Sequence, residues 1–426
     1  MKFLTPGEKV KKLRTQLNLK QEDLQDEKIT QGLISMIETN RREVTPQVAL
    51  KISNKFNKKA TELNLILNID ENYLTRYPKQ DAELYCFKQL KNEKITIVKI
   101  DEIFEITNMF DLLAVKAETY CKLGAIWSDK REFKESCDCY THAKEIFISI
   151  GITEKLGYIY WKIGDSKANI LKYDEAIEYY LLSQHYCILY NDSNTNKRLL
   201  CSLSNAYQKS NKLGLALDTI NEFLSIYDEK KEHRLYIYAQ IIKAACYEKS
   251  GNFDTVISIC NFTISKIFDS NDPALGYLYS LLGLAYCYKD NFKKSSYYFD
   301  LAEALRSKID KTNLGSTLID KSTIFIRQNL YTDAIVSTNL GLKYSKTYKN
   351  LEYQLRGNYT LAYIYLKLND VKNLEAVYLN IIELLENNDV KNLCKIYNKL
   401  ALIYLNQEKA ELCKKYLLLS DAILTK

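Results

Sequence analysis

The stretch Gly283-Leu-Ala-Tyr286-Cys-Tyr-Lys-Asp-Asn-Phe-Lys-Lys-Ser295 contains a small residue, an aromatic residue three places later and a small residue twelve places later. Related patterns recur at intervals of 39 or 40 residues, and their small first residues are Gly124, Gly164, Ser204, Ala244, Gly283, Ser322, Ala362 and Ala401. Three places after these anchors stand Trp127, Lys167, Tyr207, Tyr247, Tyr286, Phe325, Tyr365 and Tyr404. Twelve places after them stand Ser136, Ala176, Ala216, Val256, Ser295, Ala334, Leu374 and Cys413. A repeat of this length with little Pro or Gly predicts stacked helical hairpins, because each unit can bury its apolar face only against its neighbours.

This order of small, aromatic and small residues resembles the tetratricopeptide repeat, with each unit lengthened by about five residues beyond the usual ~34. A further, degenerate unit is expected to begin near Leu84, 40 residues before Gly124, with Phe87 at the aromatic position. The resemblance implies an all-α fold with a right-handed superhelix over residues 79–426. Eight clear repeats are expected from about residue 117, preceded by the degenerate one.

Length and cysteine content limit the classes of protein that the chain can represent. With 426 residues the chain exceeds one compact core, so a small domain plus a repeat array is expected. The 11 cysteines are scattered and odd in number, which is typical of free buried thiols in a reducing compartment. Cys137-Asp-Cys139 is the only close pair, and its thiols point to different faces of a helix, so that even with His142 nearby it does not complete a four-ligand set. We therefore expect no metal and no cofactor.

Targeting and catalytic signals are not recognisable in the sequence. The charged start, from Met1 to Lys12, lacks the apolar core of a signal peptide, and no apolar run approaches the ~20 residues of a membrane span. We expect a cytoplasmic protein that does not contact a membrane. No Ser/His/Asp, metal or phosphate-loop constellation is found, so an enzyme is not expected.

The basic charge of the chain is concentrated at its N-terminus. Of 60 Lys/Arg and 53 Asp/Glu, residues 1–67 hold 13 and 8, which leaves 47 and 45 for the remaining 359 residues. A basic end joined to a nearly neutral body suits an anionic partner at that end, such as nucleic acid.

Capping signals predict four short helices in this basic region. Thr5-Pro6-Gly7-Glu8 has the capping-box arrangement, which predicts a first helix that ends near Leu17. Residues 21–25 predict a short second helix, and Thr30 can cap a third helix that ends near Thr39. The fourth helix begins at Thr45-Pro46, and its expected packing residues are Val48, Leu50, Ile52 and Phe56.

Three spaced elements in these helices resemble the phage-repressor, or Xre-type, helix-turn-helix. They are Lys12-Leu13-Arg14, Leu19-Lys20-Gln21-Glu22-Asp23-Leu24 and Ile34-Ser35-Met36-Ile37-Glu38 with Asn40. The resemblance implies a DNA-binding domain over residues 1–67 and a connector over residues 68–78. The sequence departs from the family pattern at Gln25, where Ala is usual, and at Asp26-Glu27-Lys28-Ile29, which lacks the usual turn glycine.

The resemblance implies that the third helix enters the major groove with its first residues against base edges. Gln31 is the first choice for a base contact, because its amide can pair bidentately with adenine. The other candidates on or beside this face are Thr30, Gly32, Ser35, Met36 and Asn40. Gln21, Arg41 and Arg42 are expected to contact phosphates and fix the register on DNA.

Some of these side chains have a structural alternative. Arg14 can contact phosphate, but the family resemblance favours an ion pair with Glu38. Met36 can equally be a partly buried packing residue, and Arg41 and Arg42 can belong to a solvated loop.

The concave wall of a tetratricopeptide superhelix is lined by the first helix of each hairpin. If the small anchor is position eight, positions two, five, nine and twelve are expected to face the channel. The peptide-binding candidates among them are Trp161, Asp165, Arg198, Asn205, Gln208, Tyr238, Tyr277, Arg356, Tyr359 and Asn398. Amides can satisfy the main chain of an extended peptide, aromatics offer apolar surface, and arginines can hold a carboxylate. Because the chain has 34 tyrosines, composition alone can also place aromatics on this wall.

An Xre-type domain joined to long tetratricopeptide repeats resembles the RRNPP family of bacterial peptide-pheromone receptors. The resemblance implies a quorum-sensing transcription regulator, usually a homodimer, that binds a palindromic operator in double-stranded DNA. A short signalling peptide in the repeat channel is expected to alter this DNA binding. Two alternatives stay open: a phage arbitrium-like lysis-lysogeny peptide receptor, and a repeat scaffold that acts through protein-protein contacts.

Overall fold

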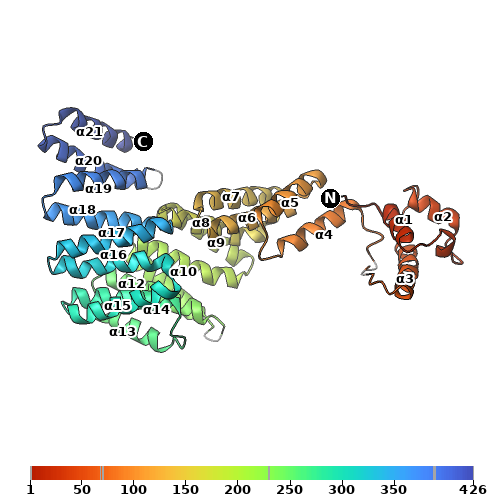
Figure 1. Ribbon diagram of the computed structural model, residues 1–426, viewed down its shortest axis with the longest axis horizontal. Coiled ribbons are helices and arrows are strands. Elements are labelled where there is room, and N and C mark those ends of the chain that lie inside the picture. Colours follow the sequence, from red (N-terminus) through yellow and green to blue (C-terminus); the bar gives the residue numbers. More distant parts are fainter. Residues whose placement is uncertain (1, 68, 70–71, 229–230, 387–389, 426) are drawn as a thin grey trace. The chain divides into compact units, whose positions relative to one another are not determined.

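The computed structural model describes residues 2–67, 69, 72–228, 231–386 and 390–425. These residues form 21 α-helices and two short 3₁₀ helices, with no strand among them (Figure 1). The predicted all-α fold class is confirmed. The helices are α1 (Pro6–Gln16), η1 (Glu22–Leu24), α2 (Gln31–Glu38), α3 (Pro46–Glu62), α4 (Pro78–Leu90), α5 (Ile97–Phe110), α6 (Leu113–Asp129), α7 (Phe133–Ser149), η2 (Thr153–Lys155), α8 (Leu156–Asn169), α9 (Tyr173–Leu189), α10 (Ser193–Lys209), α11 (Leu213–Ile226), α12 (His233–Lys249), α13 (Phe253–Ser265), α14 (Pro273–Tyr288), α15 (Phe292–Ile309), α16 (Lys311–Arg327), α17 (Tyr331–Thr347), α18 (Leu351–Lys367), α19 (Val371–Leu385), α20 (Val390–Asn406) and α21 (Ala410–Leu424).

The chain divides into two compact units. The first comprises residues 1–123 and 145–150, and the second comprises residues 124–144 and 151–426. Of the predicted connector over residues 68–78, positions 68, 70 and 71 lie outside the described residues.

The N-terminal helices begin and end close to the predicted residues, because their signals are local. The Thr5 hydroxyl accepts from the Glu8 amide and the Glu8 carboxylate accepts from the Thr5 amide, which completes the predicted capping box. The second helix is only a single 3₁₀ turn, η1. Of the packing residues predicted for α3, Ile52 and Phe56 are fully buried, whereas Leu50 is 46% exposed.

The segment that lacks the usual turn glycine closes through Asp26. Asp26 and Ile29 exchange two backbone hydrogen bonds of 3.1 and 3.2 Å, and the Asp26 carboxylate accepts from the Lys28 amide at 2.8 Å. The Asp26 side chain thus stabilises the turn with a hydrogen bond to the nearby backbone, as Asp commonly does where a turn has no glycine. Lys51 of α3 neutralises this carboxylate at 2.8 Å, so the departure from the family pattern is compensated within the domain.

Helices α4 and α5 form a hairpin where the degenerate repeat is expected. The predicted anchor Leu84 is 53% exposed, whereas Ala82 and Cys86 on the same helix are buried. Phe87 is partly buried against the cluster that contains Ala82 and Cys86. The buried face of α4 therefore lies two residues to either side of the predicted anchor.

Small residues at the repeat anchors allow the two helices of a hairpin to approach closely. The Ser136 hydroxyl donates to the Gly124 carbonyl at 2.9 Å, Ser204 donates to the Ala216 carbonyl at 2.7 Å, and Ser295 donates to the Gly283 carbonyl at 2.7 Å. Each bond joins an anchor to the residue twelve places later. The twelve-residue spacing seen in the sequence is thus the spacing of a contact across the hairpin.

A second periodic feature explains why each hairpin turns at the same place. The residue seven places after every anchor has φ between 53° and 77°, and these residues are Arg131, Leu171, Asn211, Gly251, Asp290, Asn329, Asn369 and Glu408. The next amide then donates to the carbonyl of the aromatic position at 2.8 to 3.0 Å, as in Tyr207, Tyr247 and Tyr286. This bond and the left-handed residue terminate the first helix of each repeat.

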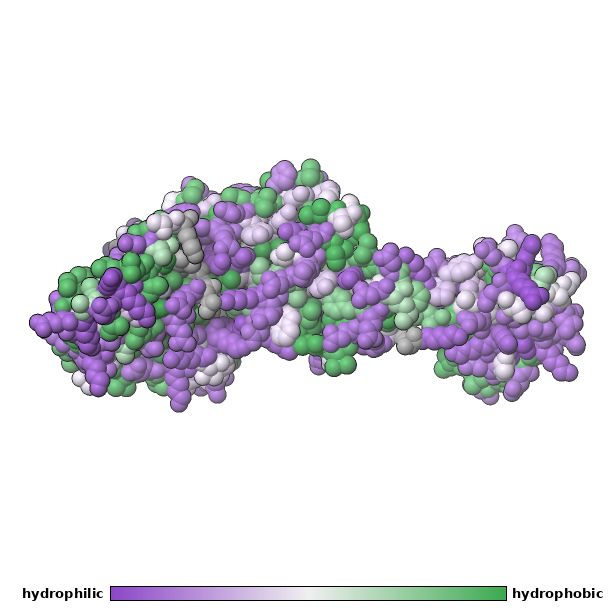
Figure 2. Space-filling view, turned by 90° about the horizontal axis from the view of Figure 1, so that it is seen from above, coloured by the Kyte–Doolittle hydropathy of each residue, from purple (hydrophilic) through white to green (hydrophobic). Residues whose placement is uncertain are grey.

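The surface and the cysteines place further limits on the molecule. Figure 2 shows hydrophilic and hydrophobic residues interspersed over the face that it presents. Among the described helices, none is both long and apolar enough to cross a membrane. All 11 cysteines are free and nine are buried, and no group of three or more His, Cys, Asp or Glu in the described part of the chain could hold a metal ion.

Candidate nucleic-acid interface and ligand cavity

The first turns of α2 present the predicted base-contacting residues to solvent. Thr30 caps the helix, and its hydroxyl accepts from the Leu33 amide at 3.3 Å. Gln31, Gly32 and Ser35 are exposed, and Met36 is 45% exposed, which favours a contact role over packing. Ile34 and Ile37 on the opposite face are buried in the domain core, so packing holds the exposed face in place.

Glu38 at the end of α2 is the hub of a buried polar network. Arg14 of α1 donates two hydrogen bonds to its carboxylate at 2.6 and 3.0 Å, and this confirms the predicted ion pair. The Gln21 amide donates to the same carboxylate at 2.9 Å. Burial opposes the ionised form, but the hydrogen bonds from Arg14 and Gln21 outweigh it and lower the pKa of Glu38. Gln21 thus has a structural role, and its contact with phosphate stays a prediction.

A compact left-handed turn follows α2 and carries the basic pair. Asn40 has φ 57°, and the Arg41 amide donates to the Met36 carbonyl at 2.8 Å. The Asn40 side-chain oxygen accepts from the Thr5 hydroxyl at 2.8 Å, which connects the turn to the start of α1. Arg41 and Arg42 are exposed directly beyond this turn. The turn therefore explains Asn40 structurally and leaves both arginines available to an anionic partner.

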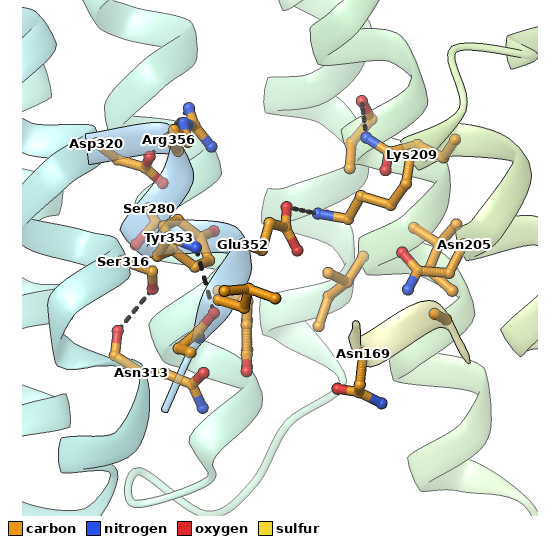
Figure 3. Close-up of a pocket in the computed structure, with 18 of the residues that line it drawn as sticks. Asn169, Asn205, Lys209, Ser280, Asn313, Ser316, Asp320, Glu352, Tyr353 and Arg356 are labelled. Atoms are coloured by element: carbon orange, nitrogen blue, oxygen red, sulfur yellow. Dashed lines mark hydrogen bonds and ion pairs between the residues drawn. The ribbon is translucent and has the colours of Figure 1, made fainter. Parts of the chain in front are cut away.

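A cavity of about 880 Å³ lies in the repeat unit, and its lining runs from Arg131, just before α7, to Arg356 of α18 (Figure 3). Five of the ten predicted peptide-binding residues line it, namely Asn205, Gln208, Tyr238, Tyr277 and Arg356. Figure 3 shows Asn313 and Ser316 on one side of the cavity, Asn169, Asn205 and Lys209 on the other, and Glu352 between them, with the Lys209 side chain extending toward it. The volume lies within the range of about 300–1,000 Å³ that is usual for pockets that enclose small ligands.

Charged side chains in the cavity are mostly cationic. Its lining contains the cations Arg131, Lys209, Lys249, Arg306, Lys349 and Arg356 and the carboxylates Glu248, Asp320 and Glu352. Glu352 forms an ion pair with Lys209, and Asp320 forms one with Arg356 at 3.0 Å. The lining as a whole therefore has three more cationic than anionic side chains.

Burial controls the protonation of several of these groups. Burial raises the pKa of Glu248, and burial together with neighbouring Lys209 lowers the pKa of Lys249. Burial also opposes ionisation of Glu352, but Lys209 outweighs it and the pKa of Glu352 is lowered. Lys209 therefore favours the carboxylate form of Glu352.

The other five predicted residues lie elsewhere on the array. Trp161 is 8% exposed and its indole donates to the Ser202 hydroxyl at 3.0 Å. Asp165 accepts from the Tyr180 hydroxyl at 2.8 Å and pairs with Lys162 at 3.3 Å. Arg198, Tyr359 and Asn398 are exposed and do not line the cavity. Trp161 thus bonds to the next repeat, and Asp165 bonds within its own hairpin.

The predicted register missed much of the cationic lining. Asn169, Lys209 and Lys249 all line the cavity, and each lies five places after an anchor, in the last turn of its helix. This periodicity is visible in the sequence and could have identified them. Arg306 and Glu352 lie outside the first-helix register used for the prediction, in the last turn of α15 and the first turn of α18.

Comparisons with known proteins agree with both parts of the fold. A helix-turn-helix family profile matches residues 10–63. Among solved structures, the apo form of the quorum sensor NprR from B. thuringiensis has a TM-score of 0.50 and 16% identity, over 81% of this chain and 99% of that chain. A Rap protein complexed with competence and sporulation factor has a TM-score of 0.50 and 12% identity, over 82% of this chain and 98% of that chain.

The chain shares its fold with the quorum sensor NprR and the Rap protein. Its N-terminal domain is an Xre-type helix-turn-helix, and its repeat region has the tetratricopeptide-like architecture of NprR and Rap. At 12 to 16% identity the likeness concerns the fold alone. No sequence among curated proteins gives a significant match.

Proposed function

We propose that this RRNPP-fold protein is a cytoplasmic quorum-sensing transcription regulator that binds a short signalling peptide in the cavity of its repeats. Its helix-turn-helix would bind a palindromic operator as part of a homodimer, and the peptide would alter that binding. The observation that carries this proposal is a polar and aromatic cavity in an array that is joined to a helix-turn-helix with an exposed α2 face. The domain limits of 1–67, 68–78 and 79–426 remain part of the proposal.

The cavity chemistry favours a peptide over an apolar metabolite. Amides of Asn169, Asn205 and Gln208 can exchange hydrogen bonds with a peptide main chain, which presents one donor and one acceptor for nearly every residue. Tyr238 and Tyr277 supply apolar area beside these amides. A ligand that satisfies both kinds of surface needs alternating polar and apolar groups, as a peptide has.

Ion pairs across the array offer a route from the cavity to the shape of the repeats. Lys209 at the end of α10 pairs with Glu352 at the start of α18, and Glu132 after α6 pairs with Lys349 before α18. These pairs join residues that are 143 and 217 positions apart in sequence. A ligand that competes for them would favour one curvature of the array over another, which is a shift between two populations.

Electrophoretic mobility-shift assays with DNA from the region next to the gene test the proposal directly. The purified chain should shift a palindrome there, and a short peptide encoded in a neighbouring small frame should change the affinity. Gln31→Ala should weaken binding by about 1–3 kcal/mol at one base position, and Arg41→Ala should lower the salt slope by about 1. Gln328→Ala, an exposed glutamine of the repeat array, is the matched control. If no peptide alters DNA binding, peptide regulation is refuted.

The same variants separate the alternatives. Full function in cells for a Gln31→Ala, Arg41→Ala protein would favour a scaffold that acts through protein contacts. A phage arbitrium-like receptor would share the DNA and peptide results, and its target promoter would control lysogeny.

A further inference from the structure

We infer that the cavity selects its ligand through a carboxylate group that is placed against the buried guanidinium of Arg306. The carboxylate can be the C-terminus of a peptide or the side chain of an Asp or Glu in it. This inference rests on the proposed peptide-binding function and names the chemistry that the site would recognise.

Arg306 is a buried charge whose hydrogen-bond partners are all neutral. It lies in the last turn of α15, is 1% exposed and forms part of the cavity wall. Its Nη1 atom donates to the Asn313 carbonyl at 3.0 Å, the Ser316 hydroxyl at 2.7 Å and the Thr317 hydroxyl at 2.5 Å. The guanidinium lies 4.4 Å from the centre of the Tyr277 ring, and no partner for Nε is found within the described part of the chain.

The nearby carboxylates are engaged by other groups. Asp310 accepts from Thr312 at 2.6 Å and from the Asn313 amide at 3.0 Å, and it forms no ion pair with Arg306 within the described structure. Asp320 lies in the electrostatic range of Arg306, but its ion pair at 3.0 Å is with Arg356. Burying a cation without a counter-ion is unfavourable, so Arg306 attracts an anion that the chain itself does not supply.

Arg306 places this charge directly behind the wall of the cavity. Asn313 and Ser316, which accept from the guanidinium, line the cavity together with Arg306. Figure 3 shows Asn313 and Ser316 beside each other on one wall. On its other side the guanidinium rests against Gly276, where a Cβ atom would lie 2.7 Å from Nε. A charge that is fixed behind a wall of low polarisability interacts strongly with an ion on the other side, since little water screens it.

The rest of the lining reinforces the same preference. Arg131 and Lys249 also line the cavity and form no ion pair within the described structure. Lys249 donates to the Gln208 carbonyl at 2.8 Å, so it too is held by a neutral oxygen. Because the wall has three more cations than carboxylates, an anionic ligand would be favoured over a neutral or cationic one of equal size.

Affinity selection with three hexapeptide libraries tests the inference on the full chain. One library has free C-termini and no Asp or Glu, the second has amidated C-termini and one Asp or Glu, and the third has amidated C-termini and no acidic residue. Peptides retained by the protein are identified by mass spectrometry, and their affinities are measured individually. We expect the best peptides of the first or second library to bind about 10- to 100-fold more tightly than the best of the third.

Two variants and a control assign the preference to Arg306. Arg306→Gln should remove the preference, and Arg306→Lys should keep part of it because it keeps the charge. Arg234→Gln, an exposed arginine of α12 that does not line the cavity, should leave it unchanged. Circular dichroism checks that each variant is folded. The library comparison on the unaltered chain tests the carboxylate preference by itself, and Arg306→Lys tests the role of Arg306 if Arg306→Gln does not fold.

The outcomes separate this inference from the proposed function. Equal retention of neutral and acidic peptides by the unaltered chain would overturn the carboxylate site while peptide binding stood. Acid selectivity that survives in folded Arg306→Gln would overturn the role of Arg306. Retention of no peptide from any library would overturn both the inference and the proposed peptide binding.

Discussion

Replacing Gly283 by Ala tests whether the repeat anchors are small because two helices touch there. An added Cβ at Gly283 of α14 would lie 2.7 Å from Cδ2 and Cε2 of Phe299 on α15. Phe299 is fully buried, so its ring cannot move aside into solvent. Overpacking of this kind costs about 1–3 kcal/mol, and the very short contact places it in the upper half of that range. The better helix propensity of Ala returns about 1 kcal/mol, which leaves a net destabilisation of about 1–2 kcal/mol.

Gly214→Ala is the matched control, because Gly214 lies in α11 and an added Cβ there meets no atom within 4 Å. This variant should gain about 0.5–1 kcal/mol from helix propensity alone. Gly283→Ala should therefore lower and Gly214→Ala should raise the free energy of unfolding, and the two variants should differ by about 1.5–3 kcal/mol. Because repeat arrays can unfold in segments, hydrogen exchange of α14 and α15 should accompany the urea denaturation curve. A Gly283→Ala protein as stable as Gly214→Ala would refute the close-contact explanation of the anchors.

Four further perturbations address the polar contacts. Arg14→Ala should destabilise the N-terminal domain by about 2–4 kcal/mol, because it leaves the buried Glu38 carboxylate without its cation; limited proteolysis of residues 1–67 measures this. The pKa of Glu38 is lower in the folded domain than in the unfolded chain, where it is about 4.3. The ionised carboxylate therefore stabilises the folded domain fully above about pH 4.3, and this stabilisation is lost as the pH falls through the folded pKa. Melting curves between pH 7 and pH 3 can follow this loss. Lys209→Met and Glu352→Gln should show a coupling energy of about 0.5–1 kcal/mol in a double-mutant cycle, and additive effects would exclude a stabilising pair. Lys9→Met removes an ion pair and two hydrogen bonds of an ammonium that is 1% exposed, so residues 72–78 should become more sensitive to protease, and unchanged cleavage would contradict this.

The N-terminal domain was predictable because its signals act over a few residues. The capping box of Thr5 and Glu8 and the cap at Thr30 set helix starts without help from distant parts of the chain. The ion pair of Arg14 with Glu38 followed from the family resemblance and is confirmed. The turn at Asp26 was not predicted, because it is closed by a hydrogen bond from the Lys28 amide to the Asp26 side chain and not by a glycine.

The candidate site was predicted only in part, and the reason is geometric. The register correctly placed Asn205, Gln208 and Tyr238 on the cavity wall, because residues on one face of a helix share one direction. It also selected Asn398 of α20, a helix that contributes no residue to the cavity, and Arg198, which lies toward the other end of α10 from Asn205 and Gln208 and does not line the cavity. The cavity spans only part of the array, and a local periodicity carries no information about where along the array it lies.

The sequence by itself determined the helical hairpins, their period of 39 or 40 residues and the helix-turn-helix ahead of them. Each of these depends on contacts between neighbouring helices or within one turn, such as the bond from Ser295 to the Gly283 carbonyl. Only the tertiary structure decided the charge of the cavity and the neutral groups that surround the Arg306 guanidinium. Lys209 meets Glu352 only after the rotations between successive hairpins have accumulated, since 143 positions separate them in the chain. The Lys209–Glu352 contact depends on the sum of small rotations at the interfaces between successive hairpins, and no short stretch of residues encodes that sum.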